Sequence, residues 1–325
     1  MKLIEPSVQL IQESNPYKLI ERIGRTCYKS ESAITEDSCY KFVDRLIKRQ
    51  HFAMLEHARF NFKLVGYRFP VELLNIPGLI LHILPKEVDD TWILNVSMSH
   101  LYNPKWYAAA ELFDVLRQMV EIQYIYNKSS ISKRLIFNNV KLSDERIDSI
   151  TLIPDIREED VDDVELQLPD LRYITFKFIT DRGTSHELVR HRCAVAQEST
   201  RYVDYTKDKF GGELTFIKPE DYDNWIGLIK DEFNSTMKNA ESSYQWLVTK
   251  GKLTPQIARQ WLPHALKTEV ILTMSLNQWE HFFNLRYKGT TGSPHPEMKR
   301  IAEMAYSIFE SLKGCKSLNL NSDNA

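Results

Sequence analysis

Alternating apolar and polar positions predict strands in three places. Residues 171–180 alternate with period two, which is typical of a half-buried strand, and residues 59–65 repeat the pattern. A third, short strand is predicted over residues 7–12. In the two longer strands the inward positions are all large and apolar: Phe60, Phe62, Leu64, Ile174, Phe176 and Phe178.

Apolar residues that recur every three to four positions predict amphipathic helices. These cover residues 35–49, 106–125 and 222–249, and a last helix begins near Ser293. Residues 127–170 lack such periodicity and carry Lys, Asn and acidic clusters. We therefore expect this segment to be a surface insertion rather than a second domain.

Composition narrows the class of protein. The chain has 325 residues, 43% of them hydrophobic and 26% charged, and a net charge of −2. This balance offers no overall attraction to nucleic acid or anionic membranes. We find no apolar stretch approaching 18 residues and no signal-peptide pattern, so we expect a cytoplasmic protein. The four cysteines are far apart and form no CxxC pair, which argues against a zinc site and a disulfide framework.

The strand over 171–180 leads into the most polar stretch of the chain, Asp181 to Tyr205. It contains four arginines, two histidines and a run of hydroxyl groups. Residues 184–192 are predicted to form a short helix, capped by Thr184 or Ser185, with functional side chains on one face. Forked guanidinium groups beside hydroxyls suit a phosphate or a planar base that bears carbonyl groups.

These residues carry a resemblance to a known family. The sequence RHR at 190–192, preceded by TDRGTSHELV and followed by QESTRY at 197–202, resembles the signature of flavin-dependent thymidylate synthases. The similarity extends to LEH before the strand at 59–65, to an A-R-x-x-L-P turn at 258–263, and to the sequences NLR and HPE near the C-terminus. It covers residues 171–310 closely, and residues 20–65 and 90–125 loosely. Six residues separate Arg192 from Ser199, where the family usually has seven.

The resemblance implies an α+β fold with a central, mostly antiparallel twisted sheet flanked by helices. One elaborated domain would span residues 1–314, including the insertion at 127–170, and residues 315–325 would be disordered. It also implies that dUMP is methylated to dTMP, with methylenetetrahydrofolate as carbon donor and FAD reduced by NADPH. The enzyme would be a homotetramer with shared active sites, without nucleic-acid or membrane partners.

The family's roles transfer to individual positions of this chain. Arg286, Arg201 and Ser199 would be catalytic, with Arg286 supporting the ionised pyrimidine. The dUMP contacts would be Glu187, Arg190, Gln197, Glu198, Ser199, Thr200, Arg201, Arg259 and Arg286. Which of Gln197 and Glu198 faces the nucleotide is left open. The FAD contacts would be His57, His191, Arg192, Cys193, Asn277 and His281, with no metal site.

Blander interpretations exist for several of these residues. His57 precedes a strand, where a histidine is often a structural hydrogen-bonding group. Cys193 fits either a packed small side chain or a thiol whose pKa is lowered by neighbouring arginines. Arg286 ends a predicted helix, where the helix dipole alone favours a cation.

Other functions fit the sequence less well. A homologue that binds nucleotide and flavin without catalysis is compatible with the shortened link after Arg192. A metal-dependent hydrolase would need His186 and His191, whose spacing is poor for two ligands on one helix face. A nucleic-acid-binding module is opposed by the balanced charge.

Overall fold

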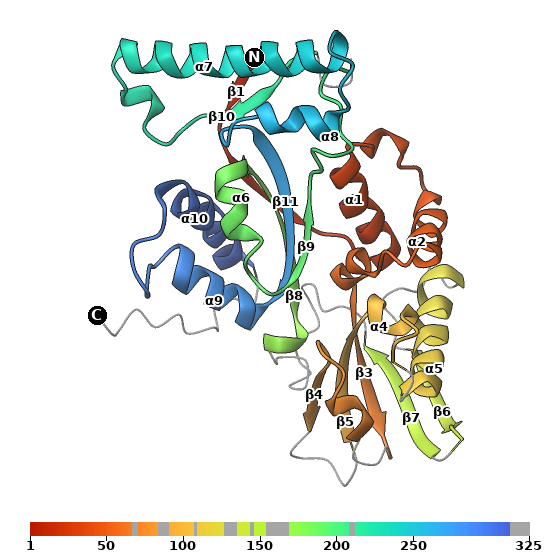
Figure 1. Ribbon diagram of the computed structural model, residues 1–325. Coiled ribbons are helices and arrows are strands. Elements are labelled where there is room, and N and C mark those ends of the chain that lie inside the picture. Colours follow the sequence, from red (N-terminus) through yellow and green to blue (C-terminus); the bar gives the residue numbers. More distant parts are fainter. Residues whose placement is uncertain are drawn as a thin grey trace.

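The computed structural model describes residues 1–66, 71–83, 91–106, 109–126, 135–143, 146–153, 169–207 and 212–312. Within these ranges the strands form three sheets, and helices pack against them (Figure 1). Antiparallel sheets flanked by helices confirm the predicted α+β class. None of the helices in these ranges combines the length and the apolar character that crossing a bilayer requires.

The central sheet is antiparallel and contains the segments that surround the polar stretch. Its strand order is β2 (Ser7–Ile11), β8 (Tyr173–Asp181), β11 (Lys267–Ser275) and β9 (Ala194–Gln197). One face packs against α6 (Arg182–Leu188), α9 (Leu276–Arg286) and α10 (Pro296–Ser311), and the other packs against α1 (Pro16–Tyr28) (Figure 1). The strand β11 is therefore covered on both sides.

A second antiparallel sheet lies beyond α1 in the direction of α4 and α5 (Figure 1). Its order is β4 (Ile80–Ile83), β5 (Thr91–Ser97), β3 (Arg59–Val65), β7 (Arg146–Ile153) and β6 (Leu135–Lys141). The shared core also contains helical segments: α2 (Ser38–Lys48), η2 (Phe52–His57), α3 (Val71–Leu74), α4 (Met98–Tyr102), α5 (Ala110–Glu121) and the π-helical turn Ile122–Tyr126.

The third sheet is a parallel pair that brings the N-terminal strand beside a strand from the second half of the chain. The strand β1 (Lys2–Ile4) pairs with β10 (Thr215–Ile217), and α7 (Gly227–Thr249) packs nearby through Met237 and Tyr244 (Figure 1). Five short helical turns complete the described elements: η1 (Glu31–Ala33), η6 (Pro169–Leu171), η8 (Tyr222–Asn224), and the consecutive α8 (Pro255–Ala258) and η9 (Arg259–Trp261).

The strands predicted from alternation are present, as β2, β3 and β8, and four predicted helices are present with shifted ends. The described part of residues 127–170 contains the β6–β7 hairpin, which the sequence analysis did not predict and which pairs with β3 through β7. Whether this segment is a surface insertion stays a prediction. The expected tail, residues 315–325, lies outside the described residues.

Candidate functional site

The polar stretch begins at a strand-to-helix junction that is set by Asp181. Its carboxylate accepts hydrogen bonds from the backbone N–H and the hydroxyl of Thr184, at 2.8 and 2.5 Å. Asp181 is therefore the N-cap of α6, because it satisfies an N–H group that the first turn leaves unpaired. The predicted cap at Thr184 or Ser185 and the predicted helix end at Arg192 were wrong. The helix ends at Leu188, and residues 190–192 lie in the turn that follows.

The segment after this turn is a strand, which the sequence analysis treated as a link. Residues 194–197 pair with β11, from Ala194 opposite Thr273 to Gln197 opposite Val270. Four residues of extended chain span roughly 13 Å. The RHR turn and the motif residues from Ser199 onward therefore lie at opposite ends of β9.

Six of the predicted site residues line one pocket of about 480 Å³ beside α9, here called the arginine pocket. The helix begins with a capping box at Ser275 and Gln278, and Trp279, Phe282 and Phe283 bury its inner face in the core. Because this inner face is held in the core, a different face of α9 lines the pocket. The lining residues are Arg190, His191, Arg192, Met274, Asn277, Gln278, His281, Leu285 and Arg286.

Arg286 is held inside the arginine pocket by two partners from the α6 end. Its Nη1 donates to Glu187 Oε2 at 2.7 Å, and its Nε lies 3.3 Å from His191 Nε2. Burial, the charge of Arg286 and His281 together lower the pKa of His191 to about 4. The imidazole is therefore neutral at pH 7, so its Nε2 can accept the hydrogen bond from the guanidinium.

A second pocket, of about 550 Å³, adjoins the first and shares Arg192 and Gln278 with it. It lies between the central sheet and the second sheet, and Arg59 of β3 and Tyr173 of β8 face each other there, with the guanidinium 4.9 Å from the ring centroid. The other lining residues are Glu56, Gly78, Ile80, Asp170, Cys193, Ala194, Thr273 and Ser275. The residues that line this pocket include the predicted FAD contacts Arg192 and Cys193.

The remaining predicted nucleotide contacts lie at the far end of β9. Arg201 is exposed and its Nε donates to Gln256 Oε1 of α8 at 2.8 Å, next to Arg259 in the following turn. The Ser199 hydroxyl accepts from the Arg201 backbone N–H at 3.3 Å. The described linings of the two pockets contain none of the following residues: Ser199, Thr200, Arg201 and Arg259.

The two residues at the end of β9 point in different directions. Gln197 donates through Nε2 to the Ser185 hydroxyl at 2.8 Å. Glu198 is buried, and its carboxylate accepts from the Tyr205 hydroxyl and from Lys267 Nζ, both at 2.9 Å. The Glu198 carboxylate thus binds protein groups in the interior.

His57, Cys193 and His186 occupy settings that the sequence left open. His57 is 1% exposed, its Nδ1 lies 2.8 Å from the Thr273 hydroxyl, and burial lowers its pKa to about 3. It lines neither the arginine pocket nor the adjoining one. Burial raises the pKa of the Cys193 thiol to about 12, so the neighbouring arginines do not activate it. His186 packs edge-on against His264 rather than beside His191.

Comparison with known proteins gives several relatives. A flavin-dependent thymidylate synthase from Pyrococcus furiosus is 35% identical over 137 residues, which cover 38% of this chain and 54% of that protein. Another from Pyrococcus horikoshii is 33% identical over 169 residues, covering 48% and 65%. The chain thus spans about half the length of the relatives it matches. A crystal structure of the UMP/dUMP methylase PolB from Streptomyces cacaoi, bound with 5-Br dUMP, aligns with 96% of this chain and 93% of that one, at 14% identity and a TM-score of 0.41.

The family model described as "Thymidylate synthase complementing protein" matches residues 9–71 and 170–312. These two segments include α1, η2, three whole strands and part of β2 in the central sheet, α6, α9 and α10. The region between them, which contributes most of the second sheet, is not matched. Because the matched residues make up more than half of its length, the chain belongs to the family described as thymidylate synthase complementing protein.

Proposed function

We propose that this protein is a flavin-dependent thymidylate synthase, which methylates dUMP to dTMP with methylenetetrahydrofolate as carbon donor and FAD reduced by NADPH. The observation that carries the proposal is the placement of Arg286 in the arginine pocket, beside a neutral His191 and at the end of α9. The names of the relatives support the same reaction.

The two adjoining pockets suit an elongated cofactor such as FAD. They share Arg192, so a single molecule can extend from one to the other past a fixed cation. Asn277 and His281 of α9 would hold the flavin end with His191, whereas Arg192 and Arg59 would face the phosphates, since guanidinium groups pair with phosphate oxygens through two hydrogen bonds. When bound, FAD supplies the hydride chemistry, and the protein supplies position and charge.

Arg286 would act on the pyrimidine of dUMP. Methyl transfer requires a nucleophilic C5, which is favoured when negative charge on the N3/O4 edge is stabilised. A guanidinium already fixed by Glu187 and His191 needs no reorientation when that charge develops. Glu187 orients Arg286 through the 2.7 Å ion pair, and Arg190 in the same pocket would hold the nucleotide from the other side.

The phosphate of dUMP would be held by Ser199, Thr200, Arg201 and Arg259. Within one chain these residues lie at the opposite end of β9 from Arg286. We therefore propose that two copies of the chain build each site, one contributing the arginine pocket and the other contributing residues 199–201 and Arg259. This arrangement agrees with a homotetramer that shares its active sites.

The test compares Arg201→Ala with Arg45→Ala. Both arginines are exposed and lie over a neighbouring aromatic ring, at 5.1 Å from Tyr202 and 5.9 Å from Phe42. We expect purified wild-type protein to show flavin absorbance and to form dTMP, with dUMP affinity reduced only by Arg201→Ala. Normal dUMP affinity and turnover in that variant would refute the assignment. Flavin binding without any dTMP formation would favour the catalytically impaired homologue.

A further inference from the structure

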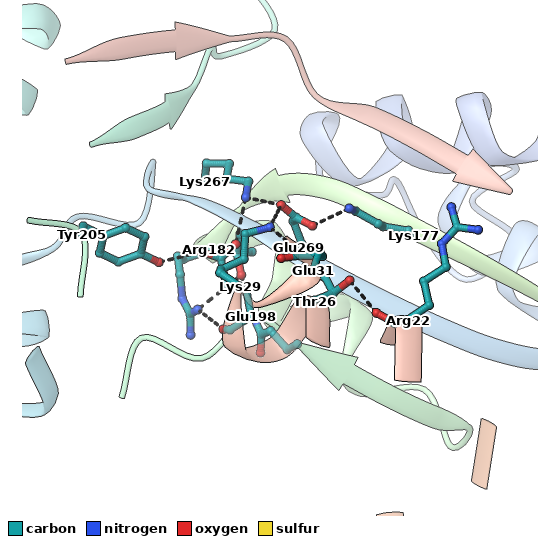
Figure 2. A network of polar contacts seen from close by, with 12 residues as sticks. Arg22, Thr26, Lys29, Glu31, Lys177, Arg182, Glu198, Tyr205, Lys267 and Glu269 are labelled. Atoms are coloured by element: carbon teal, nitrogen blue, oxygen red, sulfur yellow. Dashed lines mark hydrogen bonds and ion pairs between the residues drawn. The ribbon is translucent and has the colours of Figure 1, made fainter. Parts of the chain in front are cut away.

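A buried network of charged groups lies between α1 and the central sheet, next to the far end of β9 (Figure 2). Three lysines, Lys29, Lys177 and Lys267, converge on the carboxylate of Glu269, with Lys177 Nζ at 2.5 Å from Oε2. Burial by itself would raise the pKa of Glu269, but the charges of Lys267, Lys29 and Lys177 outweigh it and lower the pKa to about 2. The Glu269 carboxylate is therefore ionised at neutral pH.

One member, Lys267, links this network to the predicted nucleotide-binding motif. Its Nζ bonds both Glu269 Oε1 and, at 2.9 Å, Glu198 Oε2 (Figure 2). The Glu198 side chain is 1% exposed, so this ion pair is shielded from water. A buried carboxylate that loses its cation must either take up a proton or move toward solvent.

Glu198 is also fixed through its backbone, by segments that are distant in sequence. Its N–H donates to the Glu269 carbonyl at 2.8 Å, and its carbonyl accepts from Arg182 Nη1 at 3.3 Å. The next residue, Ser199, donates its N–H to the Cys27 carbonyl at 3.0 Å. The position of residues 198–201, here called the ESTR loop, thus depends on contacts that converge at Glu198.

We propose that Lys267 is a positioning residue, which acts through Glu198 to hold the ESTR loop in the geometry that binds the phosphate of dUMP. This inference rests on the proposed function, which assigns Ser199 and Arg201 to the phosphate. Lys267 is not itself a ligand contact, because it is engaged by Glu198 and Glu269 in the interior. Groups that bind a ligand need supporting residues to keep them in place, and a loop displaced by about 1 Å loses much of its affinity.

The test uses Lys267→Met with Lys177→Met as a matched control. Both lysines bind Glu269 and are similarly covered, with side chains 14% and 19% exposed, but only Lys267 touches Glu198. We expect Lys267→Met to weaken dUMP binding about tenfold by calorimetry, as is typical for loss of a supporting contact. Lys177→Met should bind dUMP as the wild type does, and Lys267→Arg should restore most of the affinity.

FAD binding is a second measurement, which distinguishes a displaced ESTR loop from a general loosening of the fold. The arginine pocket lies at the other end of β9, so both methionine variants should retain FAD with an unchanged absorbance spectrum. Equal weakening of dUMP binding by the two variants would overturn the inference, as would wild-type affinity in Lys267→Met. A wild-type protein that does not bind dUMP would overturn the proposed function and the inference with it.

A third variant covers the case in which Lys267→Met does not fold. Tyr205→Phe removes the other hydrogen bond to the Glu198 carboxylate and keeps the ring in its core position. We expect it to weaken dUMP binding several-fold while FAD is retained. Unchanged dUMP affinity in Tyr205→Phe would contradict the role of Glu198.

Discussion

Replacing Arg286 by methionine removes the guanidinium from the arginine pocket and keeps an unbranched apolar chain. Burial, Arg286 and His281 lower the pKa of His191 to about 4, and the variant lacks the second of these causes. We therefore expect the pKa of His191 to rise from about 4 toward its ordinary value of 6.5. A raised pKa means that the imidazole already gains its proton at a higher pH. As the pH is lowered, activity that needs neutral His191 should therefore be lost at a higher pH in the variant than in the wild type. An NMR titration of the imidazole Cε1–H measures this directly.

The effect on turnover should be much larger than the effect on stability. Loss of one preorganised donor to a developing negative charge typically reduces the rate by about 100- to 1,000-fold. The ion pair with Glu187 is partly solvated, because the two side chains are 21% and 25% exposed. Its removal should lower the free energy of unfolding by about 1 kcal/mol. Such a small loss of stability cannot explain a rate reduction of that size.

Arg300→Met is the matched control. Arg300 on α10 is 20% exposed and pairs with Glu297 at 3.6 Å, but it lies outside the lining of the arginine pocket. Its removal should leave the titration of His191 and the rate of dTMP formation unchanged. An unchanged His191 titration in Arg286→Met would show that the guanidinium does not lie beside the imidazole in solution, and the reasoning would fail.

Three further predictions concern stability and reactivity. The pKa of Glu269 is depressed from 4.5 to about 2, so its ion pairs stabilise the fold above pH 4.5 and are lost as the pH falls toward 2. The depressed pKa of Glu269 contributes about 3 kcal/mol to the free energy of unfolding at neutral pH. Glu269→Gln should abolish this contribution, and with it the corresponding loss of stability at low pH, in urea unfolding measured across this pH range. Trp279 is fully buried and donates to the Ile174 carbonyl at 3.0 Å, so Trp279→Ala should lower the free energy of unfolding by about 3–5 kcal/mol in chemical denaturation. Cys193, whose pKa is about 12, should resist iodoacetamide at pH 8 in peptide-resolved mass spectrometry, and rapid alkylation would contradict the raised pKa of its thiol.

The parts of the fold that sequence reasoning predicted are those with one covered face. The strand β8 alternates because one side packs against α9 and α10 and the other carries polar groups such as Lys177. The strand β11 was missed because eight of its nine residues are buried, so it shows no alternation. The strand β9 was missed because it is short and consists mostly of small residues.

In the candidate site, too, some residues could be predicted from the sequence and others are brought together only by the fold. The sequence placed Arg190, His191 and Arg192 together by adjacency, and the resemblance added three residues of α9; the structure brings all six to one pocket. Arg59 and Gln278 were missed because their roles arise only where two sheets and a helix meet. An acid within a motif suggests a ligand contact, and nothing local in the sequence indicates that Glu198 pairs with Lys267, 69 residues away.

The strand character of residues 194–197 has a consequence for the shortened segment between Arg192 and Ser199. Successive side chains of a strand face opposite sides, so an odd number of added or deleted residues reverses the parity of everything beyond the change. A seventh residue inserted within the paired positions would turn Gln197 and Glu198 to each other's sides and expel a carboxylate from the interior. We therefore expect this chain to accept an added residue at the RHR turn, before Ala194 pairs with Thr273 of β11, and not within the paired residues 194–197.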